Sequence, residues 1–258
     1  MRRFLFSGLG VFAMLALPLD ARAADLAPVT KAPAVAVFNW TGFYLGANAG
    51  YGWARNTEAI TAVNDFSGLV GGNFIATSLS IEAQGFVGGG QIGYNWQVNP
   101  RWVVGLETDL AWTDIKGSVS VPGPNDTSRI MTGTQKLDWL GTARGRLGIT
   151  PAERILLFVT GGFAYGHGNL TTALTRATAP CAISNCQKGS TSGTLAGWTV
   201  GGGAEWAFAA NWSAKAEYLY YDLGSLSHLM TDPNFPSIFN AKADFTCHIA
   251  RLGVNYRF

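Results

Sequence analysis

Residues 141–148 read GTARGRLG, and this short stretch decides the fold. Arg144 and Arg146 stand two apart among small and apolar residues. In a β-strand they point to the same side, because strand side chains alternate between the two faces. A helix would separate them, and the glycines at 141, 145 and 148 disfavour a helix. The stretch therefore predicts a strand with two positive charges on one face, and it raises the question of what lies on that side.

The chain begins with a segment that is typical of a secretory signal peptide. MRRFLFSGLGVFAMLALPLDARA (1–23) has a basic start, an apolar core and small residues at Ala21 and Ala23. The apolar core is too short for a membrane helix, which needs about 20 residues. Cleavage after Ala23 removes three of the 18 Lys and Arg residues and one of the 16 Asp and Glu residues, so the mature chain is near neutral. Its charge therefore points to no nucleic-acid partner.

After a proline-containing lead-in, the chain repeats one pattern: a run of strict alternation between apolar and polar residues, followed by a break. In the run at 137–149, one face holds Leu137, Trp139, Ala143, Leu147 and Ile149, and the other holds Asp138, Thr142, Arg144 and Arg146. The eight predicted strands are 42–53, 86–96, 102–112, 137–149, 155–166, 196–208, 212–221 and 246–258.

The breaks between these strands alternate in length. Those at 98–100, 150–154 and 209–211 are tight turns, and those at 54–85, 113–136, 167–195 and 222–245 are long. Short turns on one side and long loops on the other are typical of a transmembrane barrel of the outer membrane. The sequence thus predicts an all-β fold, an eight-stranded antiparallel up-and-down barrel with short periplasmic turns and four long extracellular loops. We expect a signal peptide at 1–23, a flexible periplasmic lead-in at 24–39 and the barrel domain at 40–258.

Aromatic residues support a membrane location, because they form two belts. Those next to the tight turns are Trp96, Trp102, Phe208, Trp212, Tyr256 and Phe258. Those towards the long breaks are Trp53, Phe86, Trp112, Trp139, Tyr165, Trp198 and Tyr220. Aromatic belts mark the two membrane interfaces. The alternative, a soluble lipocalin-like barrel, would turn its apolar faces inward and need no belts.

The side that Arg144 and Arg146 face is then the barrel lumen. The predicted lumen charges are four cations and four anions: Arg144, Arg146, Lys215, Arg251, Glu107, Asp109, Glu205 and Glu217. The interior of an eight-stranded barrel is just wide enough for side chains to fill. Buried charges are tolerated when they are paired and hydrogen-bonded. We expect a structural network that plugs the lumen; a leaky or gated passage is the alternative.

Four stretches, NWTGFYLGANAGYGW (39–53), LGTARGRLG (140–148), AEYLYYDLG (216–224) and GVNYRF (253–258), carry a resemblance. The chain resembles the small outer-membrane immunogenic porin-like proteins of rhizobia, brucellae and their relatives, which are similar to the transmembrane domain of OmpA. The resemblance implies an outer-membrane location in a Gram-negative cell, surface exposure and a role in envelope integrity. It also implies recognition by the barrel-assembly machinery through the terminal Phe258, with Tyr256 and Val254 on its face.

Weaker signals concern cysteine and histidine. Cys181 and Cys186 bracket a short loop segment of an exported chain, which favours a local disulfide. Cys247 is expected to face inward near the outer rim. The histidines at 167, 228 and 248 fall near the outer end, and Asp222, Ser225 and Ser227 lie close in sequence to His228. A catalytic set is defined by geometry rather than by sequence proximity.

The leading function is therefore a structural and surface-interaction barrel. A small diffusion channel is the second possibility, and an outer-membrane enzyme or haem-binding protein is the third. We expect no catalytic, metal or cofactor site. The expected partners are the lipid bilayer, lipopolysaccharide, the barrel-assembly machinery and surface or host ligands at the loops.

Overall fold

The computed structural model describes residues 38–63, 67–177, 186–232 and 235–258, without the side chains of 67 and 235–237. The predicted signal peptide and most of the predicted lead-in lie outside the described residues. The described chain contains one short helix, α1 (Ser67–Gly71). No helix in these ranges is long and apolar enough to cross a membrane.

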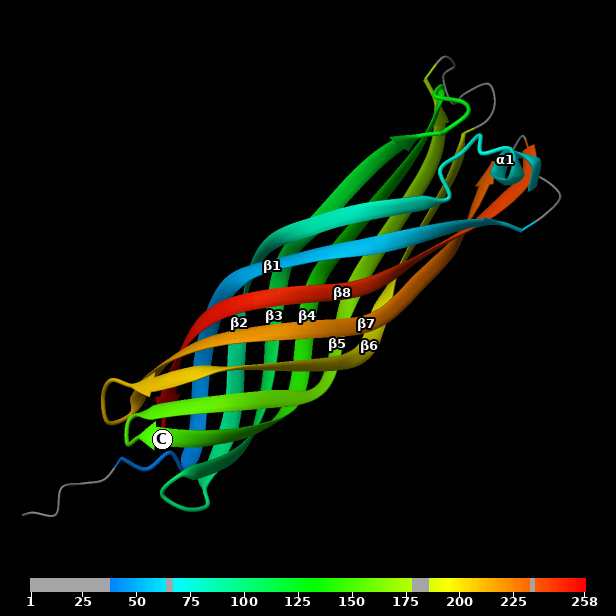
Figure 1. Cartoon of the computed structure of the whole chain (residues 1–258). Helices are drawn as coiled ribbons and strands as arrows, with labels where there is room; N and C mark the ends of the chain where they lie inside the picture. Colours follow the sequence, from blue (N-terminus) through cyan, green and yellow to red (C-terminus); the bar gives the residue numbers. More distant parts are fainter. Residues whose placement is uncertain (1–37, 64–66, 178–185, 233–234) are drawn as a thin grey trace, which may run out of the picture. The chain divides into compact units, whose positions relative to one another are not determined.

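Eight long strands make up most of the described chain (Figure 1). They are β1 (Gly42–Ala62), β2 (Ser78–Gln97), β3 (Trp102–Pro122), β4 (Arg129–Ala152), β5 (Ile155–Arg176), β6 (Gln187–Ala207), β7 (Trp212–Asp232) and β8 (Phe235–Arg257). Each strand pairs antiparallel with the next, and β1 pairs with β8, so the sheet closes into a barrel. The predicted fold class is confirmed.

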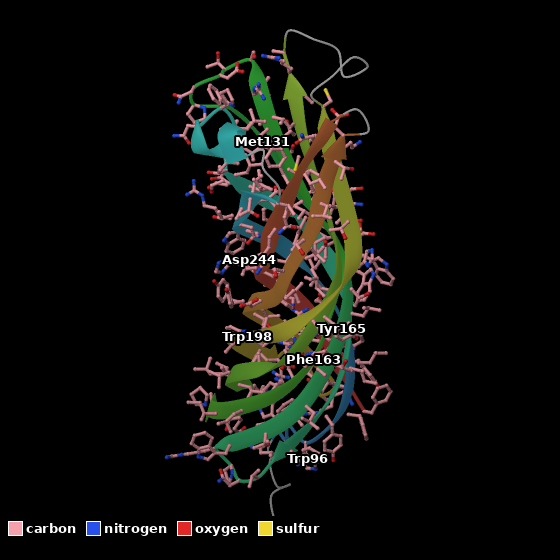
Figure 2. The ribbon with its side chains drawn as sticks, turned by 90° about the vertical axis from the view of Figure 1, so that its right-hand side faces the viewer. Trp96, Met131, Phe163, Tyr165, Trp198 and Asp244 are labelled. Atoms are coloured by element: carbon pink, nitrogen blue, oxygen red, sulfur yellow. The ribbon has the colours of Figure 1, made fainter. Side chains whose placement is uncertain are left out.

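Side chains between the two aromatic belts alternate as the sequence pattern predicts. In β1, Phe43, Leu45 and Tyr51 are exposed, whereas Tyr44 and Asn48 are buried in the interior. Figure 2 shows Trp96 near one end of the barrel, with Tyr165 and Trp198 nearer its middle. The barrel therefore presents an apolar band to its surroundings on the side of the tight turns.

Beyond the outer aromatic belt the strands continue, which corrects the predicted loops. The breaks expected at 54–85, 113–136, 167–195 and 222–245 consist mostly of strand. We call these strand extensions the outer part of the barrel. Figure 2 places Asp244 and Met131 in it, beyond Trp198.

In the outer part the side chains still alternate between the two faces, but here the apolar residues face inward and the polar residues face outward. On β1, Arg55 and Thr57 are exposed and Ile60 is buried. On β2, Leu79 and Ile81 are buried in the same way. Apolar-inside and polar-outside is the pattern of a sheet in water. The loop prediction was wrong because the strands were identified by an apolar outward face. The outward face is apolar only as far as the outer aromatic belt, so the strand residues beyond it were taken for loops.

Buried apolar side chains fill the outer part. They form a core cluster of Ile60, Ile75, Ala76, Leu79, Ile81, Met131, Leu174, Met230, Phe239 and Ala241. A second cluster lies around the level of the outer belt and includes Val87, Leu140, Leu219, Tyr221 and Ile249. The interior beyond the belt is therefore packed with apolar side chains.

Three register shifts change the alternation where the barrel passes the belt, and the first lies between Trp112 and Ile115 on the β3–β4 ladder. The β4–β5 register shifts between Leu137 and Trp139, so Leu137 turns inward and is only 5% exposed. The predicted outward Leu137 and inward Asp138 were therefore wrong. On β7 the register shifts between Asp222 and Ser225, around Gly224, whose φ of 80° suits glycine.

Strand pairing is incomplete in the outer part. The ladder between β2 and β3 ends at the pair Gln84–Lys116. Between β6 and β7 it stops at Trp198–Asp222, except for one pair near the outer ends. Figure 1 shows the outer ends of β3 to β6 running together and those of β1, β2, β7 and β8 running together. The outer part thus divides into two groups of four strands.

Candidate functional site

The two arginines that decide the fold point into the barrel interior from β4. Arg144 lies directly opposite Glu107 of β3 in the strand register, and Thr142 lies opposite Asp109. The side chains of Arg144 and Glu107 are 0% exposed. The alternation of β3 and β4 therefore brings opposite charges face to face across one ladder.

Arg144 is the centre of the charged interior. Its Nη2 atom lies 2.5 Å from Glu107 Oε1 and 2.9 Å from Asp109 Oδ2. Its Nη1 atom lies 2.8 Å from Glu217 Oε1 on β7. Its Nε atom donates to Thr142 Oγ1 at 3.0 Å. One guanidinium thus joins three carboxylates on two sides of the barrel.

Arg146 makes a second set of contacts, closer to the tight turns. Its Nη2 atom lies 2.7 Å from Glu205 Oε2 on β6, and its Nη1 atom donates to the Tyr44 hydroxyl at 3.0 Å. The Tyr44 hydroxyl in turn donates to Glu107 Oε2 at 2.8 Å. The guanidinium carbon lies 4.0 Å from the ring centroid of Phe158, a cation–π distance.

The two remaining cations come from β7 and β8. Lys215 Nζ donates to both oxygens of Glu107 at 2.8 and 2.9 Å. Arg251 Nη2 lies 3.0 Å from Asp109 Oδ2 and 2.8 Å from Glu217 Oε2. All eight predicted lumen charges are therefore buried in the interior and joined by ion pairs, four positive against four negative. We call them the charged network.

Several neutral residues that the sequence-based prediction left out complete the charged network. Asn48 Nδ2 donates to Gln91 Oε1 at 2.8 Å, and Gln91 Nε2 donates to Asn255 Oδ1 at 2.6 Å. Asn255 Nδ2 and Ser213 Oγ both donate to Glu205 Oε1, at 2.9 and 2.6 Å. These residues share the inward face with the charges, so the alternation could have identified them.

An apolar layer closes the interior towards the tight turns. It contains Trp40, Val103, Leu156, Phe158 and Ala207, all buried. Trp40 Nε1 donates to the Glu153 carbonyl oxygen at 3.2 Å. Phe38, at the end of the predicted lead-in, packs against Trp40. The charged network therefore lies between this layer and the apolar clusters of the outer part.

The other predicted site residues do not join the charged network. Val254, Tyr256 and Phe258 lie on the outward face of β8 and just after it. The Phe258 main-chain N–H donates to the Phe43 carbonyl oxygen at 3.0 Å. Whether they form an assembly signal stays a prediction. Cys181 of the predicted disulfide lies outside the described residues, and Cys247 is a free, buried thiol.

The histidines do not converge on one site. His167 stacks on Trp139, and His248 stacks on Trp53 on another part of the outer belt. His228 is buried, and neither of its ring nitrogens has a hydrogen-bond partner among the described residues. The described ranges hold no group of three or more His, Cys, Asp or Glu side chains placed to bind a metal ion.

Backbone groups in hydrocarbon must be satisfied within the protein, so only helices and closed barrels cross a membrane. This barrel pairs its charges inside and presents apolar side chains outside, so it is a transmembrane β-barrel of the outer-membrane type. The chain belongs to the family described as the outer membrane protein beta-barrel domain, whose model matches residues 23–258. The protein accordingly lies in the outer membrane.

Two curated relatives support this family. The "31 kDa outer-membrane immunogenic protein" of Brucella melitensis biotype 1 is 36% identical over 248 residues, which cover 96% of this chain and 95% of the relative. The protein of the same name from Brucella suis biovar 1 matches to the same extent. The resemblance inferred from the sequence motifs is confirmed.

Solved structures with a related arrangement share little sequence with the chain. The outer membrane protein OprG from Pseudomonas aeruginosa is 10% identical, with 86% of this chain and 99% of that chain covered and a TM-score of 0.49. Neisserial surface protein A is 13% identical, with 84% and 98% covered and a TM-score of 0.35. Similarity at this level does not extend to function.

Proposed function

We propose that the protein is a sealed structural barrel that strengthens the outer membrane and presents its outer part at the cell surface. The charged network carries this proposal. Eight paired charges occupy the cross-section of the barrel between an apolar layer on one side and apolar clusters on the other. The interior is filled by side chains rather than left as an aqueous path.

The network suits a structural role because it ties distant strands together. Arg144 joins Glu107 on β3 to Glu217 on β7, and Arg146 joins β4 to Glu205 on β6. A buried cation held by ion pairs to carboxylates on other strands has little freedom to move aside for an ion. Removing one member of such a group leaves its partners buried and unpaired, which is costly. The arrangement therefore favours one rigid barrel over a gated pore.

The outer part supports a surface role. Its strands continue well past the outer aromatic belt, with a polar exterior and an apolar interior. A folded structure of this kind keeps its shape in water outside the membrane. The relatives in Brucella are named as immunogenic outer-membrane proteins. We extend surface exposure to this chain, with lipopolysaccharide at its rim, assembly through the barrel-assembly machinery, and surface or host ligands at its tips.

Proteoliposome swelling tests the sealed interior. Purified protein is folded into vesicles loaded with an impermeant solute and diluted into isotonic arabinose. We expect no faster swelling than in protein-free vesicles, whereas a general porin included as a control swells at once. Rapid arabinose entry would favour the diffusion channel instead.

A gene deletion tests the structural role. Loss of the protein should make the outer membrane more permeable to a hydrophobic dye, and the wild-type gene should restore the barrier. A deletion strain with a normal barrier would contradict a role in envelope integrity.

A further inference from the structure

The seam between β6 and β7 has no recorded ladder over most of the outer part. Pairing runs from Ala207–Ser213 to Trp198–Asp222 and is next recorded at Lys188–Thr231. Within this gap, residues 189–197 of β6 pair with β5, and residues 225–230 of β7 pair with β8. The backbone ladder therefore does not hold β6 to β7 at this height.

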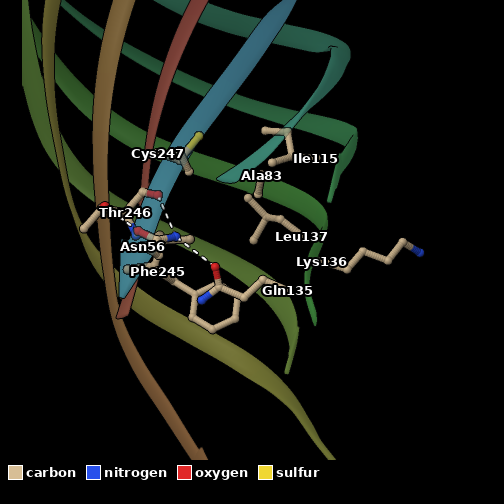
Figure 3. A pocket seen from close by; sticks show the side chains of 11 residues that line it. Asn56, Ala83, Ile115, Gln135, Lys136, Leu137, Phe245, Thr246 and Cys247 are labelled. Atoms are coloured by element: carbon tan, nitrogen blue, oxygen red, sulfur yellow. Dashed lines mark hydrogen bonds between the residues drawn. The ribbon is translucent and has the colours of Figure 1, made fainter. Parts of the chain in front are cut away.

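The gap in the β1–β8 seam is bridged by side chains. Asn56 of β1 accepts a hydrogen bond from the Thr246 main-chain N–H of β8 at 3.2 Å and donates to Gln135 Oε1 at 3.0 Å, as Figure 3 shows. Gln135 Nε2 donates to the Asp244 carbonyl oxygen of β8 at 2.9 Å. Hydrogen bonds therefore close this seam where its ladder is interrupted.

The boundary between β2 and β3 is also tied beyond the end of its ladder. There the Asn125 main-chain N–H, in the turn after β3, donates to the Asn73 carbonyl oxygen, before β2, at 2.9 Å. Among the described residues, no side-chain hydrogen bond joins 189–197 to 223–230 across the β6–β7 seam. The β6–β7 seam therefore lacks the hydrogen bonds that close the other two gaps.

His228 of β7 packs across this seam. It faces inward and is 9% exposed. Its ring lies against Gly189 of β6, where an added Cβ would come within 2.8 Å of His228 Nε2, so the glycine makes room for the imidazole. On the other side, His228 is the register partner of Ala241 of β8, a member of the apolar core of the outer part. Packing of this ring thus joins the two groups of four strands.

The surroundings of this ring suit a neutral imidazole. Neither ring nitrogen has a hydrogen-bond partner among the described residues. The next inward residue of the strand, Met230, belongs to the apolar core cluster. A buried charge without a partner costs far more free energy than a buried neutral group. Burial accordingly lowers the pKa of His228 below its usual value.

Glu58 is a buried carboxyl that approaches the same position. It reaches from β1 to Thr172 of β5, whose hydroxyl donates to Glu58 Oε1, and Thr172 is the register partner of Gly189. Burial raises the pKa of Glu58, so this carboxyl loses its negative charge as the pH falls. Glu58 therefore does not neutralise the His228 cation in acid.

The other charged groups around His228 lie further along the strand or point outward. Asp232 is buried four residues towards the tip on the same face of β7, which is about 13 Å along the strand. Lys188 of β6 and Lys242 and Asp244 of β8 have exposed side chains on the outward face. A proton taken up by His228 therefore creates a charge that the closed seam does not compensate.

We propose that the β6–β7 seam is a pH-sensitive closure of the outer part, which opens when His228 takes up a proton. The imidazolium then moves to water, and Gly189 loses the ring that packs on it. The ladder from Trp198–Asp222 to Ala207–Ser213 stays paired, so the wall around the charged network remains closed. Opening therefore exposes the apolar core of the outer part without making a path across the membrane.

The direction of the pH effect follows from the neutral state of His228. Since its pKa is lower in the folded protein, the closed seam has its full stability above the unfolded pKa of about 6.5 and loses stability as the pH falls through the folded pKa. Glu58 acts in the opposite direction, because its raised pKa favours the folded form in acid. Substituting His228 alone separates the two effects.

Two native methionines report opening in the wild-type protein. Met131 and Met230 are both 0% exposed in the apolar core of the outer part. The folded protein receives a short pulse of hydroxyl radicals at pH 7.5 and at pH 4.5, and mass spectrometry gives the oxidation of each methionine relative to the unfolded protein at the same pH. We expect at least fivefold more oxidation at pH 4.5. Equal normalised oxidation at the two pH values would overturn the proposal.

His228→Gln removes the titrating group and keeps a neutral side chain. Its methionines should be oxidised to the same extent at both pH values. His248→Gln is the matched control, because His248 lies on the outer belt, stacked on Trp53 and away from the seam, and this variant should keep the full acid response. A response that persists in His228→Gln, or that is lost in His248→Gln, would contradict the role of His228.

A disulfide across the seam tests which boundary opens. Lys188→Cys combined with Thr231→Cys places two thiols at the pair recorded beyond the gap. The oxidised form should show no extra methionine oxidation at pH 4.5, and reduction should restore it, whereas the reductant should leave the acid response of the wild type unchanged. An acid response in the oxidised form equal to that in the reduced form would place the opening at another seam and overturn the proposal.

Discussion

Glu107 of β3 and Arg144 of β4 are direct partners in the strand register, and their side chains meet inside the barrel with Arg144 Nη2 2.5 Å from Glu107 Oε1. The pair links the local alternation of two strands to the buried ion pairs that cross the interior. Each residue also bonds a second strand, Glu107 to Lys215 and Arg144 to Glu217, both on β7. The same two side chains therefore form both the ion pair between neighbouring strands and the contacts that cross the barrel to β7.

Arg144→Ala should destabilise the barrel by about 3–5 kcal/mol, because it leaves buried carboxylates without a partner. Adding Glu107→Gln should recover part of the loss, since the two residues share one network. Urea unfolding in lipid vesicles, followed by tryptophan fluorescence, measures both effects. The control is Arg55→Ala, which removes an exposed pair with Glu82 worth at most about 1 kcal/mol. Equal losses in Arg144→Ala and Arg55→Ala would contradict the network.

Leu106→Arg should cost about 2–4 kcal/mol, because it places a charge on the outward face between the belts at mid-membrane depth. Leu106 is 60% exposed on the surface that contacts lipid. The matched control is Thr57→Arg, which is also outward-facing but lies beyond the belt in the outer part. We expect the control to change the free energy of unfolding by about 0.5 kcal/mol or less. Similar costs at both positions would place the membrane boundary elsewhere.

Deletion of Phe258 should lower the amount of folded protein in the outer membrane. The last strand must pair with β1 to close the barrel, and Phe258 already bonds to Phe43 at this seam. Phe208→Ala, which removes an aromatic of the same belt just after β6, should assemble at normal levels. Membrane fractionation and heat-modifiable gel migration measure how much of each variant is folded in the outer membrane. Normal levels of the deletion variant would argue against a C-terminal assembly signal.

Glu58 should make the outer part more stable in acid than at neutral pH. It is fully buried beyond the outer belt, where one carboxylate oxygen accepts a hydrogen bond from Thr172 and the other has no partner among the described residues. Burial raises the pKa of the Glu58 carboxyl above its usual value. Because the folded-state pKa is the higher one, this stability is complete below the unfolded pKa of about 4.3 and is lost as pH rises through the folded pKa.

Glu58→Gln should therefore raise the unfolding temperature at pH 8 and have little effect at pH 4. The exposed neighbour Glu82→Gln serves as the control and should show no such gain at pH 8. Thermal unfolding in detergent, followed by circular dichroism at the two pH values, gives the comparison. A Glu58→Gln variant that is no more stable than wild type at pH 8 would refute this assignment.

Much of the barrel could be predicted from the sequence, because the bilayer imposes one strict rule on it. Between the belts every outward side chain is apolar or small, so Phe43, Leu45 and Tyr51 identify the lipid side, and Arg144 and Arg146 identify the interior. Closure in sequence order follows from short turns and alternating faces. The same rule assigned all eight lumen charges to the inward face.

The outer part could not be predicted in this way, because its solvent is water. There the apolar residues Ile60 and Leu79 face inward. This is the reverse of the region between the belts, where the apolar residues face outward. The bulge at Leu137 and the one around Gly224 change the phase by one residue, and neither leaves a clear signal in the sequence. Alternation places neutral residues such as Tyr44 on the inward face, but it does not show which charged group each one bonds, because that depends on distances across the barrel.

The central claim is that side chains seal the interior, and single-channel recording in planar bilayers tests it most directly. Wild-type protein should give no stable conductance, because the charged network and its apolar neighbours fill the cross-section. Arg144→Ala should open a small leak that prefers cations, since the interior then carries net negative charge, whereas Arg55→Ala should remain closed. A large and stable conductance in the wild type, unchanged by Arg144→Ala, would contradict the sealed barrel and establish a channel.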